Sequence, residues 1–257
     1  MTAKKIAYAF AATVLMTAGA QAADIARPVY KAAPVVAPMY NWSGFYVGGH
    51  AGWAWADSKV DGTTGTFDNN GPQSQTLKPD DWMWGGQIGY NWQAGNWVLG
   101  IEADLGELNP SANVTFFGPG SAGNDDIFSV AYGRYYTVTG RLGWAMDRAL
   151  WYVKGGYVNA KISQTAGDTD GGNIDPTDSV AVSKNRGGWT LGGGLEYGLT
   201  PNWSVKVEYL YMDFSNVSIA NLDAGNETYT FSDSVQTVKF GLNYRFDWGK
   251  APVMAKY

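Results

Sequence analysis

The sequence predicts an all-β fold: an eight-stranded antiparallel transmembrane β-barrel with short periplasmic turns and long extracellular loops. Three observations predict it. Eight segments alternate between apolar and polar side chains with the period of two that a strand imposes. Their apolar faces carry no charge in mid-strand, whereas the opposite faces carry charges of both signs, which is typical of a barrel with lipid outside and a polar lumen. The connections alternate between tight turns and long polar stretches.

The composition favours one large β domain and excludes two functional classes. The chain has 257 residues with 34 Gly, 12 Trp and no Cys, so a disulfide-stapled scaffold is excluded. Its formal net charge is −5, and removal of Lys4 and Lys5 with a signal peptide takes the charge to −7. We expect no nucleic-acid partner, because nucleic-acid binding requires basic patches.

The N-terminal residues predict export. Lys4 and Lys5 precede an apolar run of about 13 residues and a small-residue cleavage site ending at Ala22, and the run is shorter than the ~20 residues of a spanning helix. The following residues are rich in Pro, Ala and Val, which indicates an extended segment. The chain therefore divides into a signal peptide (1–22), a Pro-rich periplasmic leader (23–43), an outer-membrane β-barrel (44–246) and a C-terminal tail (247–257).

The eight expected strands follow one another through the barrel region. They lie at about 44–56, 82–93, 97–107, 132–146, 150–164, 187–199, 202–214 and 234–246. The last is the clearest example, because Val238, Phe240 and Leu242 share one face while Lys239 and Asn243 lie on the other. Tight turns are expected at 94–96, 147–149 and 200–201, and long polar loops at 57–81, 108–131, 165–186 and 215–233.

Tryptophan residues gather near the expected strand ends. Aromatic rings concentrate at both membrane–water interfaces, because their bodies are apolar and their polar edges bond to water. We therefore predict membrane-interface aromatic side chains at Trp53, Trp55, Trp82, Trp84, Trp92, Trp97, Trp144, Trp151, Trp189 and Trp203. The alternative is a soluble β-sandwich with aromatic clusters in its core, which would leave the charges of the opposite faces exposed.

The polar faces predict a charge network in the lumen. Its members are Glu102, Asp104, Arg141, Lys154, Glu196, Lys206, Glu208, Lys239 and Arg245. Eight strands enclose a space just wide enough for side chains, and charges at low dielectric need partners. We therefore predict salt bridges that largely plug the lumen. Two uses of the network stay open: packing without transport, and a narrow or gated ion path through a rearranged network.

No catalytic, metal or cofactor site is predicted. His50 is the only histidine, and it lies on the lumen face near the middle of the first strand, where a neighbouring carboxylate could pair with it. It has no second ligand for a metal or haem, and a Ser-His-Asp site at an outer rim would need a histidine in or beside a loop. The acidic residues 168–175 lack the Gly and Glu positions of an EF-hand calcium loop. We expect no enzymatic activity and no cofactor.

Both ends of the expected barrel resemble a known family. The run N-W-S-G-F-Y-V-G-G at 41–49 and the run G-L-N-Y-R-F at 241–246 are similar to the opening and closing strands of small Gram-negative outer-membrane immunogenic proteins, also described as porin-family proteins with an OmpA-like barrel. Tyr197, Trp203 and residues 208–211 resemble the hairpin before that last strand. The tail after residue 246 departs from the family pattern, in which chains usually stop there.

The resemblance implies a surface-exposed antigen in the cell outer membrane, with a structural or host-contact role. The resemblance also implies the barrel-assembly machinery and a host ligand as partners. The transmembrane pattern implies outer-membrane lipid, and the acidic loops predict contact with lipopolysaccharide through shared divalent cations. We expect a monomer. Two alternatives from other classes stay open. One is a small-solute or ion channel. The other is a surface receptor for haem or another host ligand; some relatives are credited with binding haem, but no residue here maps to such a site.

Overall fold

The computed structural model describes residues 40–62, 74–117, 124–170, 173–221 and 227–246. They form ten strands: β1 Gly44–Gly62, β2 Ser74–Leu77, β3 Asp80–Ala94, β4 Trp97–Leu108, β5 Ser111–Phe117, β6 Asn124–Met146, β7 Ala149–Asp170, β8 Asn173–Gly198, β9 Trp203–Asn221 and β10 Glu227–Arg245. The expected signal peptide, most of the leader and the tail lie outside the described residues. Within those residues, no helix is long and apolar enough to cross a membrane.

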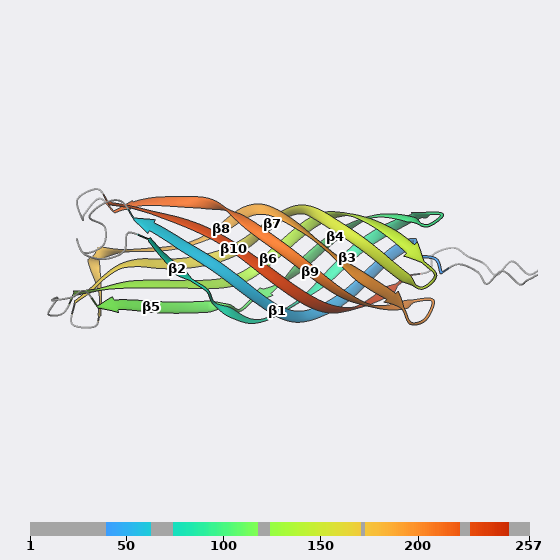
Figure 1. Ribbon diagram of the computed structural model, residues 1–257, viewed down its shortest axis with the longest axis horizontal. Helices are drawn as coiled ribbons and strands as arrows, with labels where there is room; N and C mark the ends of the chain where they lie inside the picture. Colours follow the sequence, from blue (N-terminus) through green and yellow to red (C-terminus); the bar gives the residue numbers. More distant parts are fainter. Residues whose placement is uncertain (1–39, 63–73, 118–123, 171–172, 222–226, 247–257) are drawn as a thin grey trace, which may run out of the picture. The chain divides into compact units, whose positions relative to one another are not determined.

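Eight of the strands close into an antiparallel ring. Neighbours follow the order β10, β9, β8, β7, β6, β4, β3, β1, and β1 pairs with β10 to complete the circle (Figure 1). The seam between β1 and β10 is continuous, from Tyr46 opposite Arg245 to Gly62 opposite Tyr229. The predicted eight-stranded antiparallel barrel is therefore confirmed, and each expected strand corresponds to one strand of the ring.

The two short strands continue the path of β3 and β4 beyond a proline. β2 ends at Leu77 before Pro79, and β5 begins at Ser111 after Pro110. Proline has no N–H to donate to a ladder, so it interrupts a strand. The carbonyl groups of Pro79 and Pro110 still accept hydrogen bonds from Ala56 and Tyr132, at 2.8 Å and 3.0 Å. β2 thus stays paired to β1, and β5 to β6.

The strands extend much farther than the sequence analysis expected. Tight turns join β3 to β4, β6 to β7 and β8 to β9 as predicted, and we call this side of the barrel the turn end. At the other side, β1 continues to Gly62, β7 to Asp170 and β9 to Asn221, and β6 begins at Asn124. The expected strand ends there are wrong, because most residues assigned to loops are paired β structure.

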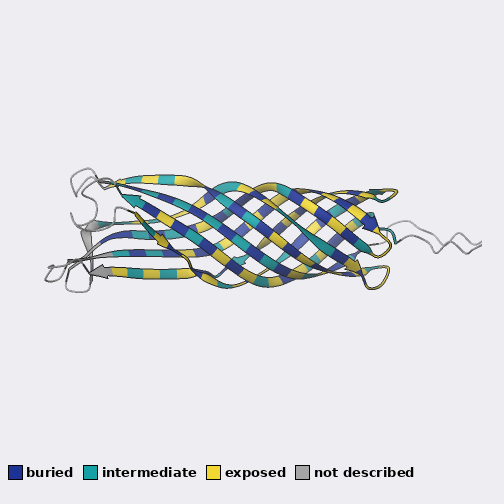
Figure 2. Ribbon diagram, in the orientation of Figure 1, coloured by how far each residue is buried: buried dark blue, intermediate teal, exposed yellow. Residues whose placement is uncertain are grey.

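The outward face of the barrel changes character along each long strand. Exposed and buried residues alternate along the long strands (Figure 2). On β7, the exposed outward residues in order from the turn end include Trp151, Val153 and Tyr157, and they are followed by Lys161 and Thr165. On β1, Trp53 and Trp55 are followed by Asp57, Lys59 and Asp61. The apolar outward stretch from Phe45 to Trp55 spans 11 residues, which matches the 9–11 that a tilted strand needs to cross a bilayer. We call the part of the ring beyond Trp55, Tyr157 and Trp189 the extension.

Inward side chains change from charged to apolar in the same direction. We call the part of the ring between the turn end and the extension the membrane band. Lys154 on β7 is buried in the membrane band, whereas Val158, Ala160 and Ile162 are buried in the extension. The extension therefore has the apolar interior and polar exterior of a soluble β-barrel. The membrane band has the reverse pattern, which is that of a transmembrane barrel. The point of reversal on each strand marks the membrane boundary.

Candidate functional site: the barrel lumen and its two ends

Two glutamates and two lysines form the centre of the lumen network. Lys154 Nζ lies 2.6 Å from Glu102 Oε1 and 2.8 Å from Glu208 Oε1. Lys206 Nζ lies 3.2 Å from Glu102 Oε2 and 3.6 Å from Glu208 Oε2. Each lysine therefore bridges both glutamates, and all four side chains are almost wholly buried. They come from β4, β7 and β9, so the contacts cross the lumen rather than follow one ladder.

Lys239 on β10 extends the network to a third carboxylate. Its Nζ lies 2.9 Å from Asp104 Oδ2 and 3.0 Å from Glu208 Oε1. Glu208 thus contacts three lysines at once. Such sharing is expected where several ions are removed from water together, because an unpaired ion in this environment would cost several kcal/mol.

Arg141 and Glu196 form a second pair nearer the turn end. Arg141 Nη2 lies 2.5 Å from Glu196 Oε2, while Ser204 Oγ and Asn243 Nδ2 donate to Glu196 Oε1 at 2.5 Å and 2.9 Å. The network thus contains four acids (Glu102, Asp104, Glu196, Glu208) and four bases (Arg141, Lys154, Lys206, Lys239). Their formal charges balance.

Two tyrosines that the sequence analysis did not include complete the hydrogen bonding of the network. Tyr46 donates to Glu102 Oε2 and Tyr152 donates to Glu208 Oε2, each at 2.8 Å. Tyr46 fits because the neighbouring strand has Gly89, where a Cβ would lie 2.3 Å from the tyrosine oxygen. The alternation of the strands places both tyrosines inward, and this was the signal that could have found them.

His50 lies inside the barrel next to the charge network. Its Nδ1 is 2.6 Å from Gln87 Oε1 and 3.7 Å from Asp104 Oδ2, and its Nε2 is 2.9 Å from the Tyr135 hydroxyl. Gln87 in turn donates to Asn243 at 2.7 Å. No cluster of three His, Cys, Asp or Glu residues suited to a metal ion occurs in the described residues. His50 is thus held by polar neighbours, and none of them is a nucleophilic serine.

Arg245, which we predicted to join the lumen charges, lies apart from them. Its Nη2 donates to the Pro201 carbonyl at 2.6 Å, and its guanidinium carbon lies 4.7 Å and 5.3 Å from the ring centroids of Tyr40 and Trp42. It forms no ion pair with a carboxylate in the described part of the chain. The aromatic residues come from the leader, and the strand pattern gave no sign that the leader enters the barrel.

The end of the leader closes the turn end of the barrel. Trp42 is fully buried and packs with Val98, Leu150 and Tyr152. Its backbone N–H donates to Gln93 Oε1 at 2.7 Å. The Tyr40 hydroxyl donates to the Thr200 carbonyl at 2.8 Å, and its ring occupies the space over Gly198, where a Cβ would lie 2.3 Å from the ring. We call Tyr40, Trp42 and their contacts the stopper.

An apolar layer fills the barrel in the extension, on the other side of the charge network. Its buried side chains include Ala54, Ala56, Val60, Met83, Leu108, Phe128, Val130, Val158, Ala160, Ile162, Leu210, Met212, Phe214, Phe231 and Val235. They come from nearly every strand of the ring. The sequence analysis missed this layer for two reasons. Most of these residues lie within expected strands whose inward faces it took as polar throughout, and the rest, such as Phe128 and Phe231, lie in segments that it assigned to loops.

One buried polar cluster interrupts the apolar layer. Asp233 pairs with Arg186 and accepts hydrogen bonds from Tyr132 at 2.8 Å and Gln164 at 3.0 Å. The β8–β9 ladder ends where Gly188 pairs with Phe214. Beyond that point the Arg186 guanidinium bridges the strands, with Nη2 2.6 Å from the Ser215 carbonyl and 3.2 Å from the Phe231 carbonyl. Arg186 and Asp233 were assigned to loops in the sequence analysis.

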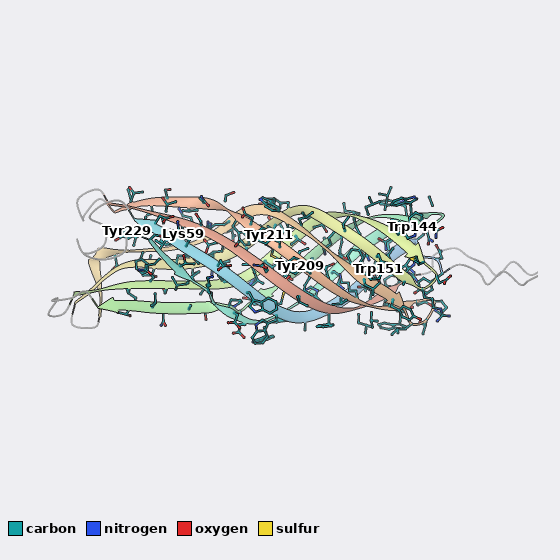
Figure 3. All side chains as sticks on the ribbon, in the orientation of Figure 1. Lys59, Trp144, Trp151, Tyr209, Tyr211 and Tyr229 are labelled. Carbon is teal, nitrogen blue, oxygen red and sulfur yellow. The ribbon has the colours of Figure 1, made fainter. Side chains whose placement is uncertain are left out.

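The predicted interface tryptophans stand on the outside of the barrel in two belts. One lies at the turn end (Trp92, Trp97, Trp144, Trp151, Trp203) and the other at the membrane boundary with the extension (Trp53, Trp55, Trp82, Trp84, Trp189). All ten are between 41% and 57% exposed. Figure 3 shows Trp144 and Trp151 near one end, Tyr209 and Tyr211 farther along, and Lys59 beyond them. The two belts bracket the apolar outward band.

Comparisons with known proteins agree with this geometry. Residues 9–246 match the family model described as "Outer membrane protein beta-barrel domain". The chain is 32% identical over 240 residues to the 31 kDa outer-membrane immunogenic protein of Brucella melitensis biotype 1, covering 90% of this chain and 95% of that one. It is 30% identical over 247 residues to the 25 kDa outer-membrane immunogenic protein of Brucella canis, covering 95% and 99%.

Among solved structures, the outer membrane protein OprG from Pseudomonas aeruginosa is similar with a TM-score of 0.43 and 16% identity, covering 79% of this chain and 97% of that one. A TM-score this low adds nothing to the fold already described. The family match spans most of the chain, and the relatives are named as outer-membrane proteins. The chain therefore belongs to the outer-membrane β-barrel family and is a surface protein of the outer membrane.

Proposed function

We propose that this protein is a closed structural barrel that contributes to envelope integrity and presents its extension for contact with a host or the environment. Three blocks fill the lumen in succession: the stopper, the charge network and the apolar layer. The relatives are named immunogenic, which supports exposure at the cell surface. The extension supports a contact role, because it raises paired strands beyond the membrane boundary.

The apolar layer is the observation that carries the proposal. A hydrated ion crossing the barrel would have to pass side chains such as Phe128, Phe231 and Leu210, which offer no hydrogen bonds and are at most 3% exposed. Moving an unpaired ion into apolar surroundings is costly, so opening the charge network alone would not create a path. This favours the structural role over the channel alternative.

We also propose that the chain is not an enzyme. The four lumen carboxylates are each engaged by a base or by several donors, which leaves no free general acid or base there. His50 faces Gln87 and Tyr135 instead of a nucleophile. The alternative of a haem or host-ligand receptor has no specific contact in its favour among the described residues.

Planar-bilayer conductance tests the proposal. The refolded full chain is added to a lipid bilayer at both polarities, after heat-modifiable migration in a detergent gel has shown that the barrel is folded. We expect no steady current above the lipid baseline. Reproducible single-channel steps from folded protein would overturn the closed-barrel proposal and favour the channel.

A further inference from the structure

A bulge in β6 opens a pocket on the outside of the barrel. Tyr132 pairs with Ile162 and Tyr135 with Ala160, so β6 has one residue more than β7 between these pairs. A bulge leaves the extra residue unpaired and turns the strand locally. Here both tyrosines stay inward and Arg134 is exposed on the outside. A cavity of about 770 Å³ lies over the bulge, between β4, β6, β7 and β8.

Three cations without partners line this pocket, which we call the bulge pocket. They are Arg134, Lys161 and Lys184, one from each of β6, β7 and β8. All three are exposed, and none of their charged groups forms an ion pair or hydrogen bond with another described residue. Glu107 is the one carboxylate in the lining, directly opposite Arg134 in the β4–β6 ladder without forming an ion pair to it. The bulge pocket therefore carries an excess of positive charge.

The bulge pocket lies at the membrane boundary. Tyr136 and Tyr157, whose ring centroids are 6.1 Å apart, belong to the belt of aromatic rings there, and Tyr136 also lines the pocket. Arg134 is two residues beyond Tyr136, and Lys161 is four residues beyond Tyr157. At about 3.3 Å per residue, the two charges stand roughly 7 to 13 Å along the strands from the rings. This is the level of lipid headgroups, since aromatic belts mark the edge of the hydrocarbon.

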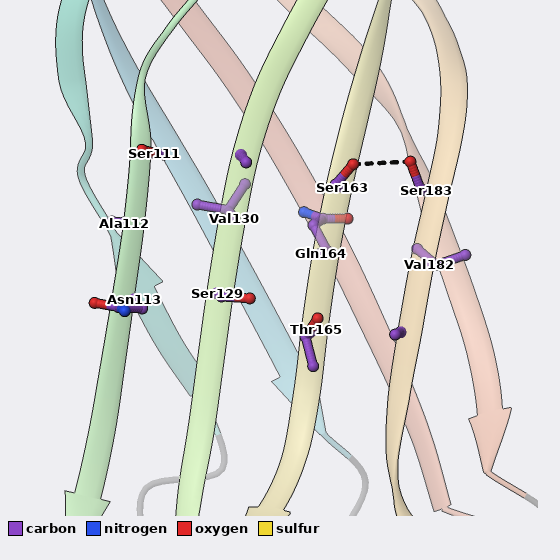
Figure 4. A pocket seen from close by; sticks show the side chains of 12 residues that line it. Ser111, Ala112, Asn113, Ser129, Val130, Ser163, Gln164, Thr165, Val182 and Ser183 are labelled. Carbon is purple, nitrogen blue, oxygen red and sulfur yellow. Dashed lines mark hydrogen bonds between the residues drawn. The ribbon is translucent and has the colours of Figure 1, made fainter. Parts of the chain in front are cut away.

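A second cavity continues from the bulge pocket into the extension. It measures about 490 Å³ and shares Ala131, Ser163 and Ser183 with the bulge pocket. Its other outward polar side chains are Ser111, Asn113, Ser129 and Thr165, which are hydroxyl and amide groups without formal charge (Figure 4). Ser163 and Ser183 hydrogen bond across two strands at 2.8 Å. Neutral hydroxyl and amide groups in such a groove can exchange hydrogen bonds with sugar hydroxyls.

The order of these surfaces points to one ligand. Moving away from the turn end, the outside of the barrel offers an apolar band, then three cations, then a hydroxyl-lined groove. We propose that this surface binds a phosphorylated glycolipid of the outer leaflet, with acyl chains against Leu105 and Tyr136. Its phosphate lies among Arg134, Lys161 and Lys184, and its sugars lie in the groove beyond. Cations form strong, charge-assisted hydrogen bonds to phosphate oxygens.

Lipid binding to the refolded full chain tests this proposal. Native mass spectrometry in detergent measures the affinity for diphosphorylated lipid A. The variant carries Arg134→Gln, Lys161→Gln and Lys184→Gln, and the matched control carries Lys59→Gln, Lys78→Gln and Arg148→Gln, which removes the same charge from exposed sites elsewhere. Because each cation contributes to headgroup binding, we expect affinity to fall roughly a hundredfold in the pocket variant and to stay within about threefold in the control. Equal loss in both variants would overturn the site.

Three ligands separate the parts of the proposal. Dephosphorylated lipid A should bind the wild type as weakly as diphosphorylated lipid A binds the pocket variant. Phosphatidic acid, which has the phosphate but no sugar, should bind roughly tenfold more weakly than lipid A, because it makes no contact in the groove. Millimolar inorganic phosphate should not displace lipid A. Equal binding of phosphatidic acid, or displacement by inorganic phosphate, would contradict a glycolipid site.

A third variant protects the test against a folding failure. Glu107→Gln removes the one carboxylate of the bulge pocket and leaves every cation in place. Loss of this repulsion should tighten lipid A binding a fewfold in a protein with wild-type heat-modifiable migration. Weaker or unchanged binding in this variant would count against a phosphate among the three cations.

Discussion

At the scale of single residues, Glu208 is the most connected charge of the lumen. Its carboxylate contacts Lys154, Lys206 and Lys239 and accepts a hydrogen bond from Tyr152. These partners come from β7, β9 and β10. In the ring, β8 lies between β7 and β9 and supplies none of the contacts. Glu208 therefore couples strands that do not all pair directly. The network fixes how the strands face one another across the lumen, in addition to neutralising charge.

Glu208→Gln should strongly destabilise the barrel. The amide keeps the shape of the side chain but leaves three buried lysines with one carboxylate fewer, and breaking a buried ion pair in this way costs about 3–5 kcal/mol. The free energy of unfolding, from urea titrations of the folded and unfolded gel bands, should fall by that amount. Asp57→Asn removes an exposed partner of Lys78 and should change it by less than about 0.5 kcal/mol. Similar effects of both variants would contradict a stabilising network.

Much of the lumen could be predicted from alternation alone. The four acids and four bases that meet in the network all lie at inward positions of the expected strands. Arg245 also lies inward, but its partners Tyr40 and Trp42 come from a Pro-rich segment whose sequence has no strand period. Re-entry of such a segment depends on the space left at Gly198, which is a property of the folded barrel and cannot be read from local pattern.

At the scale of elements, each long strand carries two opposite patterns in series. β10 is charged inward at Lys239 and apolar inward at Val235 and Phe231, while its outward residues change from Phe240 to Ser232. Period-two alternation continues through the change, but the inward face becomes apolar and the outward face becomes polar. The sequence analysis expected β10 to begin only at Ser234, close to this change, and assigned 215–233 to a loop. Separately, Pro79 and Pro110 interrupt the path of two strands.

Cysteine scanning along β7 should reveal the reversal, and the chain has no native cysteine to interfere. Thr165→Cys, outward in the extension, should react with a membrane-impermeant maleimide on intact cells. Val153→Cys, outward in the membrane band, should react only with a lipid-soluble reagent, because acyl chains cover it. Ala160→Cys, inward in the apolar layer, should react with neither until the barrel is unfolded. A reactive Ala160→Cys in folded protein would show that water enters the extension.

At the scale of the whole barrel, both sides of the charge network are covered. The stopper lies on one side and the apolar layer on the other, and the pairing of β1 with β10 closes the ring across the membrane band. Membrane-crossing strands require such closure, since every backbone N–H and C=O in lipid must be paired. The charged lumen is therefore separated from water by apolar side chains at both ends.

Trp42→Ala should weaken the barrel without opening it. Truncation of a fully buried tryptophan costs about 3–5 kcal/mol, so the temperature at which the folded gel band disappears should fall markedly. Bilayer conductance should remain at baseline, because the charge network and the apolar layer are intact. Trp92→Ala, at an exposed position of the turn end, serves as the control and should lower that temperature less. Channel activity in Trp42→Ala would mean that the stopper alone seals the barrel.

The length of the extension sets how far the strands project from the outer membrane. β7 continues for 13 residues from Tyr157 to Asp170. At about 3.3 Å per residue and a tilt near 40°, this gives a height of roughly 30 Å above the edge of the hydrocarbon. An extension of that height, with its own packed interior, would hold the far ends of its strands clear of the short inner sugars on neighbouring lipids. Antibodies could then reach those strand ends without touching the bilayer.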